Sequence, residues 1–214
     1  MSNVQIEITA SLDGYVAGPD ATLEEPLGKG GERLHEWAYA IESWRQAHGL
    51  EGGERNIDSE VLEASLAATG AIVMGRRMFS GGEGAWADDP NANGWWGETP
   101  PFGVPVFVVT HHAREQLVLG DTTFTFVTDG PEAALRLAKE AAGDRKVNIA
   151  GGASVAQQLL RAGLVDELHL HVAPILLGGG VRLFEGLDGE IAFEITSVVE
   201  SPAVTHLRYR VVRP

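Results

Sequence analysis

The chain has 214 residues, a length that suits one domain, and 44% of its residues are hydrophobic, which excludes wholesale disorder. Its 30 acidic and 16 basic side chains give a net charge of −14, which argues against a surface for nucleic acids or anionic membranes. It lacks cysteine, which excludes disulfides, thiolate zinc sites and cysteine nucleophiles, and with neither a signal-like N-terminus nor a long apolar run we expect a cytoplasmic protein.

The N-terminal part predicts a strand, a loop and a helix. Residues 4–10 alternate apolar and polar side chains, as a half-buried strand does. A turn follows at Asp13-Gly14, and residues 19–31, rich in proline, glycine and glutamate, predict a loop. Apolar side chains then recur at helical spacing, which predicts a helix over residues 32–47.

A second helix is predicted after a polar, glycine-rich connection at residues 48–57. Asp58 and Ser59 offer side-chain oxygens that suit a helix N-terminus. The apolar side chains expected to face inward are Val61, Leu62, Leu66 and Ala67.

Buried strands alternate with helices through the rest of the chain. Strands are predicted at residues 71–75, 105–110, 124–128, 147–152 and 167–176. Helices are predicted over residues 130–142 and directly after residue 152, whereas residues 80–103 read as a long loop. Residues 193–201 and 205–212 alternate around Pro202 and predict an antiparallel pair. The fold class is therefore α/β, with a mixed, mainly parallel sheet, helices on both faces and a C-terminal antiparallel hairpin, in a single domain over residues 1–214.

Three predicted strand ends carry groups that suit anions, and ligands of such sheets bind beyond the carboxyl ends of strands. The three ends comprise Gly151, Gly152, Ala153 and Ser154; Gly75, Arg76 and Arg77; and Thr110, His111 and His112. Glycines let a phosphate approach the unpaired N–H groups of a following helix, and arginine binds oxyanions bidentately. Taken singly, the glycine segment can be an ordinary strand-to-helix turn, and the two arginines can be ordinary surface residues. Together they favour a nucleotide with separated phosphates, such as a dinucleotide.

The histidines do not define a metal site by spacing. His169 and His171 point to the same face of their predicted strand, which permits two-point ligation, but no third ligand is fixed. A packed or hydrogen-bonded pair explains them, so we predict no metal. A nucleophilic triad is also not indicated, because no serine lies in a Gly-Xaa-Ser-Xaa-Gly elbow.

Four segments, in chain order, resemble the dihydrofolate reductase fold. They are SLDGYVAG (11–18), AIVMGRRMF (71–79), PVFVVTHH (105–112) and the run from VNIAGG to VRLF (147–184). Within this fold the sequence is most similar to the C-terminal reductase domain of the bifunctional riboflavin-biosynthesis deaminase-reductase. The resemblance covers nearly the whole chain.

The resemblance implies NADPH as hydride donor. It implies that Gly75, Arg76 and Arg77 meet phosphates of the adenosine half, and that Thr110 and His111 lie near the adenine ribose and its 2′-phosphate. The pyrophosphate would lie on Gly151, Gly152, Ala153 and Ser154, and the nicotinamide would be bordered by Thr9, Ala10, Val16 and Ala17.

The substrate implied by the resemblance is a small heterocycle, pterin-like or like 5-amino-6-(5-phosphoribosylamino)uracil. His35 and Glu36 are the expected proton donors, since a histidine titrates near neutral pH. Glu32 is expected to contact the substrate, as is His171, which falls where dihydrofolate reductases place a pterin-contacting hydroxyl. Asp13 begins a loop that can close over the ring, and Trp86 offers a flat face. The structural alternatives are solvated helix charges, packed imidazoles and a tryptophan lid or subunit contact.

Other functions remain open from the residues alone. The alternatives are a nucleotide-binding module without turnover, a true dihydrofolate reductase and a flavin-binding reductase. The partners expected are a small-molecule substrate and a second copy in a homodimer, with the apolar segment Ala173–Leu177 and the terminal hairpin as the contact.

Overall fold

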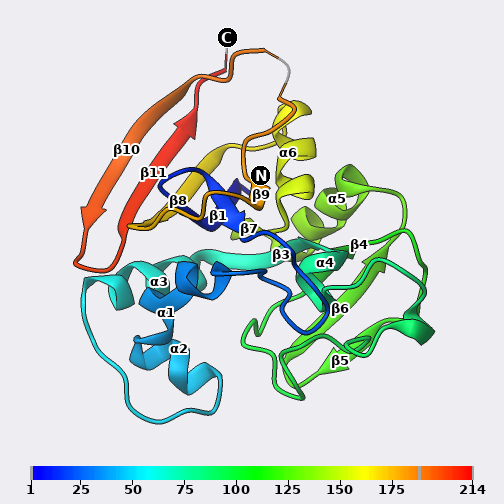
Figure 1. Ribbon diagram of the computed structural model, residues 1–214. Coiled ribbons are helices and arrows are strands. Elements are labelled where there is room, and N and C mark those ends of the chain that lie inside the picture. The colour runs from blue at the N-terminus through cyan, green and yellow to red at the C-terminus, as the bar shows by residue number, and fades with distance from the viewer. Residues whose placement is uncertain (1, 188, 214) are drawn as a thin grey trace.

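A nine-stranded sheet lies at the centre of the molecule (Figure 1). The computed structural model describes residues 2–187 and 189–213. The strand order is β10-β11-β8-β1-β7-β3-β4-β6-β5; the pairings from β8 to β6 are parallel, and those at both ends are antiparallel. The strands are β1 Val4–Ser11, β3 Thr69–Gly75, β4 Val106–Val109, β5 Leu117–Leu119, β6 Thr122–Val127, β7 Lys146–Gly151, β8 Glu167–Ala173, β10 Phe193–Glu200 and β11 Thr205–Val211. The predicted mixed, mainly parallel sheet with a C-terminal hairpin is confirmed.

Helices cover both faces of this sheet, as predicted. They are α1 Glu36–Tyr39, α2 Glu42–Ala47, α3 Ile57–Ala68, α4 Arg76–Ser80, α5 Pro131–Ala142 and α6 Ala153–Arg161, with short 3₁₀ helices η1 Gly31–His35 and η2 Trp86–Asp88. Figure 1 shows α1 to α3 together on one side of the molecule and α5 and α6 on the other. Within the described residues, no helix combines the length and apolar character that crossing a membrane requires.

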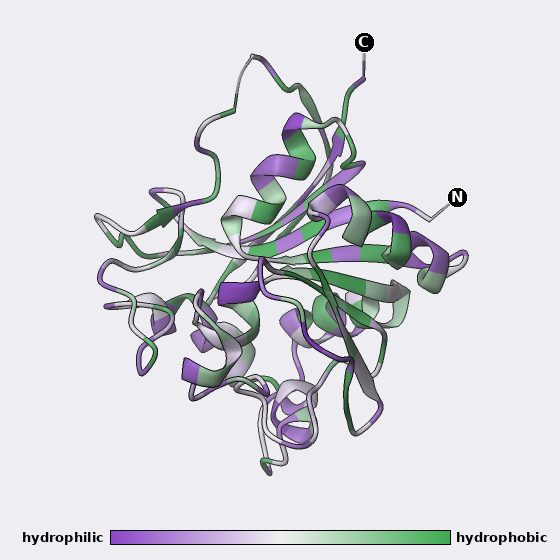
Figure 2. Cartoon of the chain, turned by 90° about the vertical axis from the view of Figure 1, so that its right-hand side faces the viewer, coloured by the Kyte–Doolittle hydropathy of each residue, from purple (hydrophilic) through white to green (hydrophobic). Residues whose placement is uncertain are grey.

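One face of the sheet is uniformly apolar. Ile6 of β1, Val73 of β3 and Ile149 of β7 point to this face and pack against Leu135 of α5 and Leu159 of α6. Figure 2 shows hydrophobic colour along the strands of the sheet, with hydrophilic stretches between. Parallel strands covered by helices read as continuous apolar runs, which is why these strands and helices were predictable from pattern alone.

The opposite face is divided into an apolar half and a polar half. Under α4 and the long loop, Met74, Val106 and Phe124 pack around Phe79. Under α3, the same face is polar and buried. Its polar side chains are Gln5, Glu7, Thr9, Asn148, His169, His171, His206 and Arg208.

The predicted orientation of the α3 helix is wrong for two of its four side chains; Val61 and Leu62 are half-buried, and Leu62 packs against the cluster of Trp37 and Ile41. Leu66 and Ala67 are exposed, whereas Asp58, Ser59 and Ser65 are buried against the polar half of the sheet. The reason is that the face of the sheet beneath α3 offers hydrogen-bonding partners rather than apolar surface. The N-cap is Asn56, which forms a capping box with Ser59, so Asp58 is free to bond elsewhere.

The helix predicted over residues 32–47 is divided into η1, α1 and α2. The break falls at Ile41, whose backbone is extended and forms an isolated bridge with Glu54. Burial of Leu34, Trp37 and Ile41 explains the helical spacing that the sequence shows.

Smaller differences concern strand ends and short strands. β8 ends at Ala173 rather than at residue 176, because Pro174 has no N–H for the ladder. The sequence did not predict β5 or the two-stranded sheet of β2 (Tyr15–Ala17) and β9 (Val181–Arg182). Strands of two or three residues are too short to show an alternating apolar and polar pattern.

Candidate active site

The predicted strand ends meet at one edge of the sheet. β1, β7, β3 and β4 are neighbours and run parallel, so their carboxyl ends lie side by side. Met74 is in register with Gly151, and Gly75 with Val109, the residue before Thr110. The structure thus brings together the three anion-suited segments that lie far apart in the sequence.

The junction of β7 and α6 is open at its backbone. The Gly151–Gly152 peptide bond is cis, and Gly152 caps α6 without a side-chain hydrogen bond. A Cβ added to Gly152 would meet nothing within 4 Å, and Ser154 in the first turn is exposed. The first N–H groups of a helix have no partner within the helix, so this N-terminus presents unpaired donors to a free space.

Gly75 lies directly against this junction. A Cβ on Gly75 would lie 3.2 Å from Cγ2 of Val155 and 3.4 Å from the Gly152 nitrogen. Position 75 therefore packs tightly against the junction of β7 and α6, whereas the side of Gly152 is open and leaves room for a ligand.

Arg76 does not point outward, and this corrects the expectation that its side chain meets a phosphate. Its guanidinium is buried, where Nη1 donates to Ser80 and to the carboxylate of Asp89. The carbon of the guanidinium lies 3.5 Å from the ring centroid of Trp86. Burial alone would raise the pKa of Asp89, but the hydrogen bonds from Arg76 and Ser80 bring that pKa below its usual value.

Arg77, by contrast, is exposed on α4 and forms an exposed ion pair with Glu83. His111 is exposed, and Thr110 is buried, with its hydroxyl accepting from the His112 backbone N–H at 3.1 Å. Of the cationic side chains in these segments, Arg77 is therefore free to reach a ligand with little rearrangement.

The residues predicted to border a nicotinamide lie at the end of β1 and in β2. Ala10 and Val16 are buried, and Ala17 is half-buried. The hydroxyl of Thr9 accepts from the indole nitrogen of Trp37 at 3.3 Å.

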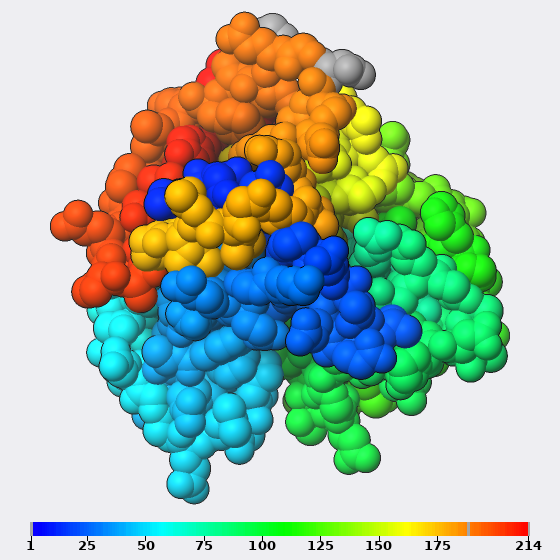
Figure 3. All heavy atoms as spheres, in the orientation of Figure 1, coloured from blue at the N-terminus to red at the C-terminus, as the bar shows by residue number. Residues whose placement is uncertain are grey.

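A cavity of about 710 Å³ opens beside these segments. Its walls are residues 18–23 with Pro26, residues 81–85 with Asp88 and Asp89, and Arg77, Gly180 and Val181. Figure 3 shows the loop after β2, in blue, next to the teal segment around α4. The loop of residues 19–31 is fixed by backbone hydrogen bonds, from Gly18 to Leu27 and from Lys29 to Pro19.

The cavity has the size of a small-molecule site, and its lining is mostly glycine, proline and small apolar residues, with four carboxylates and one arginine. Asp20, Glu83, Asp88 and Asp89 face it beside Arg77. The segment Gly151 to Ser154 lies outside this lining, so the space above α6 and the cavity are adjoining parts of the edge rather than one enclosed pocket.

The predicted proton donors lie on the segment that packs against β1 and β8. His35 ends η1 and is half-buried, and burial lowers its pKa. Glu36 is exposed at the start of α1. Glu32 is exposed and accepts from the hydroxyl of Tyr39 at 2.8 Å. His35 and Glu36 therefore stay predictions, with His35 the better shielded of the two.

Asp13 is held by the protein itself. Its carboxylate accepts from the hydroxyl of Ser11 at 2.6 Å and from the backbone N–H groups of Leu177 and Gly178 at 3.1 and 2.7 Å. The hydrogen bond from Ser11 and those from the two backbone groups hold the pKa of Asp13 at about 2. The residue thus ties the turn after β1 to the segment after β8, a structural task that the sequence did not suggest.

Trp86 is also occupied by protein contacts. Besides Arg76, the guanidinium of Arg114 lies 4.6 Å from its ring centroid, and its edge packs against Phe79 and Phe126. Its indole N–H donates to the His112 carbonyl at 2.7 Å. The expectation that this ring offers a free face to a substrate is therefore not supported by its packing.

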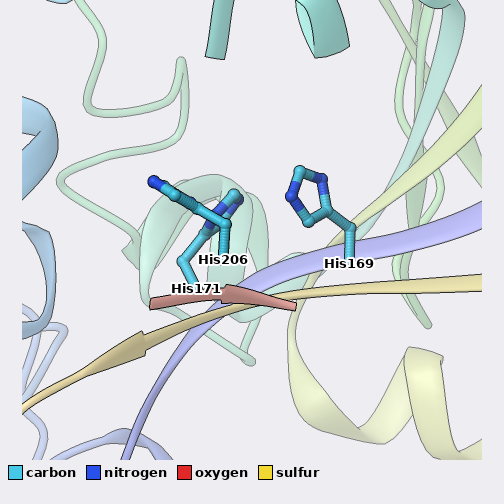
Figure 4. Close-up of side chains that lie close together, drawn as sticks. All are labelled: His169, His171 and His206. Atoms are coloured by element: carbon cyan, nitrogen blue, oxygen red, sulfur yellow. The ribbon is translucent and has the colours of Figure 1, made fainter. Parts of the chain in front are cut away.

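His171 lies in a buried group with His169 and His206 (Figure 4). Its ring centroid is 4.7 Å from that of Trp37. Its Nδ1 is 2.6 Å from Nδ1 of His206, whose Nε2 is 2.8 Å from Asp58. Burial lowers the pKa of His171 to about 4, against the opposing effect of Glu7. Glu7, which the sequence analysis missed, is therefore a partner of His171, and Asp58, which it expected at a helix N-terminus, is a partner of His206.

The strand order, the glycine junction before α6 and the terminal hairpin define a dihydrofolate reductase-like fold. A dihydrofolate reductase from Enterococcus faecalis, in complex with NADP(H) and RAB-propyl, has a similar structure with a TM-score of 0.53, 14% identity, and coverage of 98% of this chain and 96% of that one. Within this fold class, the chain belongs to the RibD C-terminal domain family, which it matches over residues 2–207.

Two further proteins are similar to this chain. A protein assigned provisionally to riboflavin biosynthesis in Shewanella sp. PV-4 superposes with a TM-score of 0.63 at 23% identity, with both chains fully covered. The riboflavin biosynthesis protein RibD of Bacillus amyloliquefaciens is 45% identical over 64 residues, which are 28% of this chain and 17% of that protein. The chain matches 51% of the length of one curated relative, from Bacillus subtilis, and 17% of the length of this RibD protein.

Proposed function

We propose that this chain is a reductase that transfers a hydride from NADPH to a small heterocycle of the pterin or aminouracil kind. Residues 1–214 act as one domain, because strands from both ends of the chain share the sheet. The observation that carries the proposal is the open N-terminus of α6 behind Gly152, at the edge where Gly75 and Thr110 also end their strands. Membership of a family with a dihydrofolate reductase-like fold supports it.

The cofactor-binding residues follow from this edge. The N–H groups of Ala153 and Ser154 bind the pyrophosphate, with Gly151 and Gly152 letting it approach. Arg77 and His111 serve the ribose phosphate of the adenosine half, and Thr9, Ala10, Val16 and Ala17 border the nicotinamide. NADPH supplies the hydride, and the protein orients the two rings and excludes water.

The substrate lies beside the nicotinamide on the side of η1 and α1, where His35 and Glu36 are; neither residue lines the cavity of about 710 Å³, which Arg77 borders. A hydride added to a C=N bond leaves a nitrogen that requires a proton, and His35 or Glu36 supplies it.

Turnover tests this function. Purified protein is mixed with NADPH and a panel of dihydropterins and ribosylated aminopyrimidines, and loss of the NADPH absorbance is followed. Consumption with one of these classes is expected. Cofactor binding without consumption across the panel would instead favour the nucleotide-binding module, and turnover of dihydrofolate alone would favour a true dihydrofolate reductase.

Replacing Arg77 with alanine should weaken NADPH far more than NADH, by about tenfold or more, because a guanidinium binds a 2′-phosphate that NADH lacks. Fold stability should hardly change, since the pair with Glu83 is exposed. Titration of both coenzymes against wild type and variant measures the effect, and equal losses for the two would remove Arg77 from the phosphate site.

A homodimer is also proposed. Apolar side chains lie exposed on the segment after β8 and on the terminal hairpin, with Leu176 at 72%, Ile195 at 63% and Val198 at 59% exposure. These large exposed apolar side chains lie on the two segments expected to form the contact and support the proposed homodimer. Light scattering of the purified protein gives the mass that decides it.

A further inference from the structure

Three histidines gather in one buried place on the polar half of the sheet. His169 and His171 project from β8 and His206 from the neighbouring β11, and Figure 4 shows their side chains on the same side of the strands. One ring nitrogen of each lies within 4.8 Å of those of the other two. All three are buried to 98% or more, and Glu7 of β1 stands beside them.

Three atoms of this group that can ligate a metal ion lie close together: one carboxylate oxygen and two ring nitrogens. Oε1 of Glu7 lies 3.1 Å from Nδ1 of His169 and 3.4 Å from Nε2 of His171. Among the described residues none of these three atoms has a hydrogen-bond partner, although each is buried. Metal–ligand bonds of the length found in tetrahedral zinc sites put neighbouring ligand atoms about 3.3 Å apart, so these separations suit a shared ion.

The surrounding hydrogen bonds fix which atoms carry lone pairs. When Nε2 of His206 donates to Asp58, its Nδ1 must accept the hydrogen from Nδ1 of His171. Nε2 of a neutral His171 is then an acceptor aimed at the Glu7 carboxylate, another acceptor. Two acceptors in contact require a cation between them, either a proton or a metal ion.

The other groups around Glu7 hold its second oxygen. Oε2 accepts from Ser65, Gln5 and Asn148 at 2.5, 3.1 and 3.0 Å, which orients Oε1 toward the histidines. His206 holds Nδ1 of His171 and is itself held by Asp58, so the pair orients His171 as carboxylate–histidine pairs orient ligands at metal centres.

Charge and access also suit a cation. Glu7, Asp58 and Glu60 are the nearby carboxylates, and Arg208 is the opposing cation. Its Nε donates a long hydrogen bond, 3.5 Å, to Nε2 of His169, and an ion bound at Nδ1 of His169 has to displace this bond. A cavity of about 200 Å³ between α3 and the sheet is lined by His169, His206 and Glu60, which gives an ion a route to the group.

We propose that Glu7, His169 and His171 ligate a divalent transition-metal ion of the zinc class, with His206 and Asp58 as the supporting pair. The sequence analysis noted that His169 and His171 share a face of their strand but predicted no metal. β1 supplies a third group through its register with β8, in which Glu7 lies opposite His169. None of these residues lines the cavity beside Arg77, although His171 lies opposite Thr9 in the sheet.

Metal binding to the whole chain tests this directly. The chelator-treated protein is titrated with Zn²⁺ by calorimetry and with Co²⁺ by visible absorption. One equivalent of Zn²⁺ should bind, Co²⁺ should give the intense visible bands of a tetrahedral nitrogen–oxygen site, and Zn²⁺ but not Mg²⁺ should raise the melting temperature. A proton between Glu7 and His171 produces none of these signals.

The variants Glu7→Gln and His171→Gln remove ligands while keeping side-chain size, and His112→Gln is the matched control because His112 is exposed. Loss of the cobalt bands in the first two and their retention in the control is the expected result. Should a ligand variant fail to fold, the wild-type titrations still decide: no binding of Zn²⁺ or Co²⁺ to folded wild type overturns the proposal, as does unchanged binding in both ligand variants.

Discussion

Replacing Gly152 with valine should weaken NADPH binding by about 100-fold while leaving the fold intact. The backbone at this position is extended, with φ −75° and ψ 178°, which valine adopts readily, and its Cβ would enter free space. The added side chain blocks the approach to the N–H groups that open α6. The loss corresponds to about two charge-assisted hydrogen bonds. Nicotinamide fluorescence gives the affinity, and urea unfolding gives the stability.

Gly75→Ala is the contrasting variant. Its methyl group would press on Val155 and on the Gly152 nitrogen at 3.2 and 3.4 Å, so it should lower stability as well as affinity. If Gly152→Val binds NADPH as wild type does, the pyrophosphate does not lie on α6.

Replacing Arg76 with methionine should destabilise the fold by about 3–5 kcal/mol, because it leaves the buried carboxylate of Asp89 without its cation. Arg77→Met is the matched control one residue away, where the ion pair with Glu83 is exposed and should contribute about 0–1 kcal/mol. Urea unfolding of both variants measures the difference.

The effect of Arg76→Met should also depend on pH in a defined direction. In wild type the pKa of Asp89 is lowered, so this ion pair stabilises the fold above the unfolded-state pKa and loses its effect as pH falls through the folded-state pKa. Without Arg76, burial raises the pKa of Asp89. Protonation of Asp89 at low pH then removes the unpaired buried charge that destabilises the Arg76→Met variant. The gap between wild type and variant should therefore be largest at neutral pH and shrink in acid; a gap that grows in acid contradicts this assignment.

The apolar part of the architecture could be predicted from the sequence because its signal is local. The runs at residues 71–75 and 147–152 are apolar throughout, as strands buried on both faces are, and α5 carries a regular apolar stripe. The meeting of Gly75 with Gly152 followed from the rule that parallel strands end at a common edge.

The polar half of the sheet could not be predicted in the same way. Alternation in residues 4–10 correctly indicates two faces, but nothing in it says that Glu7 is covered by α3 rather than by water. α3 in turn buries Asp58, Ser59 and Ser65, which a search for apolar stripes assigns to solvent. The only local signal was the pair His169 and His171; its partner His206 lies on β11 and is joined by sheet register.

Arg76 shows a different limit. The sequence indicates two arginines at a strand end, but whether each turns inward depends on Asp89, which lies 13 residues further on in a loop without periodicity. Tertiary packing, with Trp86 over the guanidinium, decides between the two neighbours.

The central claim, that a nicotinamide dinucleotide binds along the carboxyl edge of the sheet, is tested most directly by titrating NADPH against folded wild-type protein and following nicotinamide fluorescence. Saturable binding of one equivalent per chain, lost in Gly152→Val, is the predicted result. No binding up to about 300 μM, well above most coenzyme affinities, would contradict it.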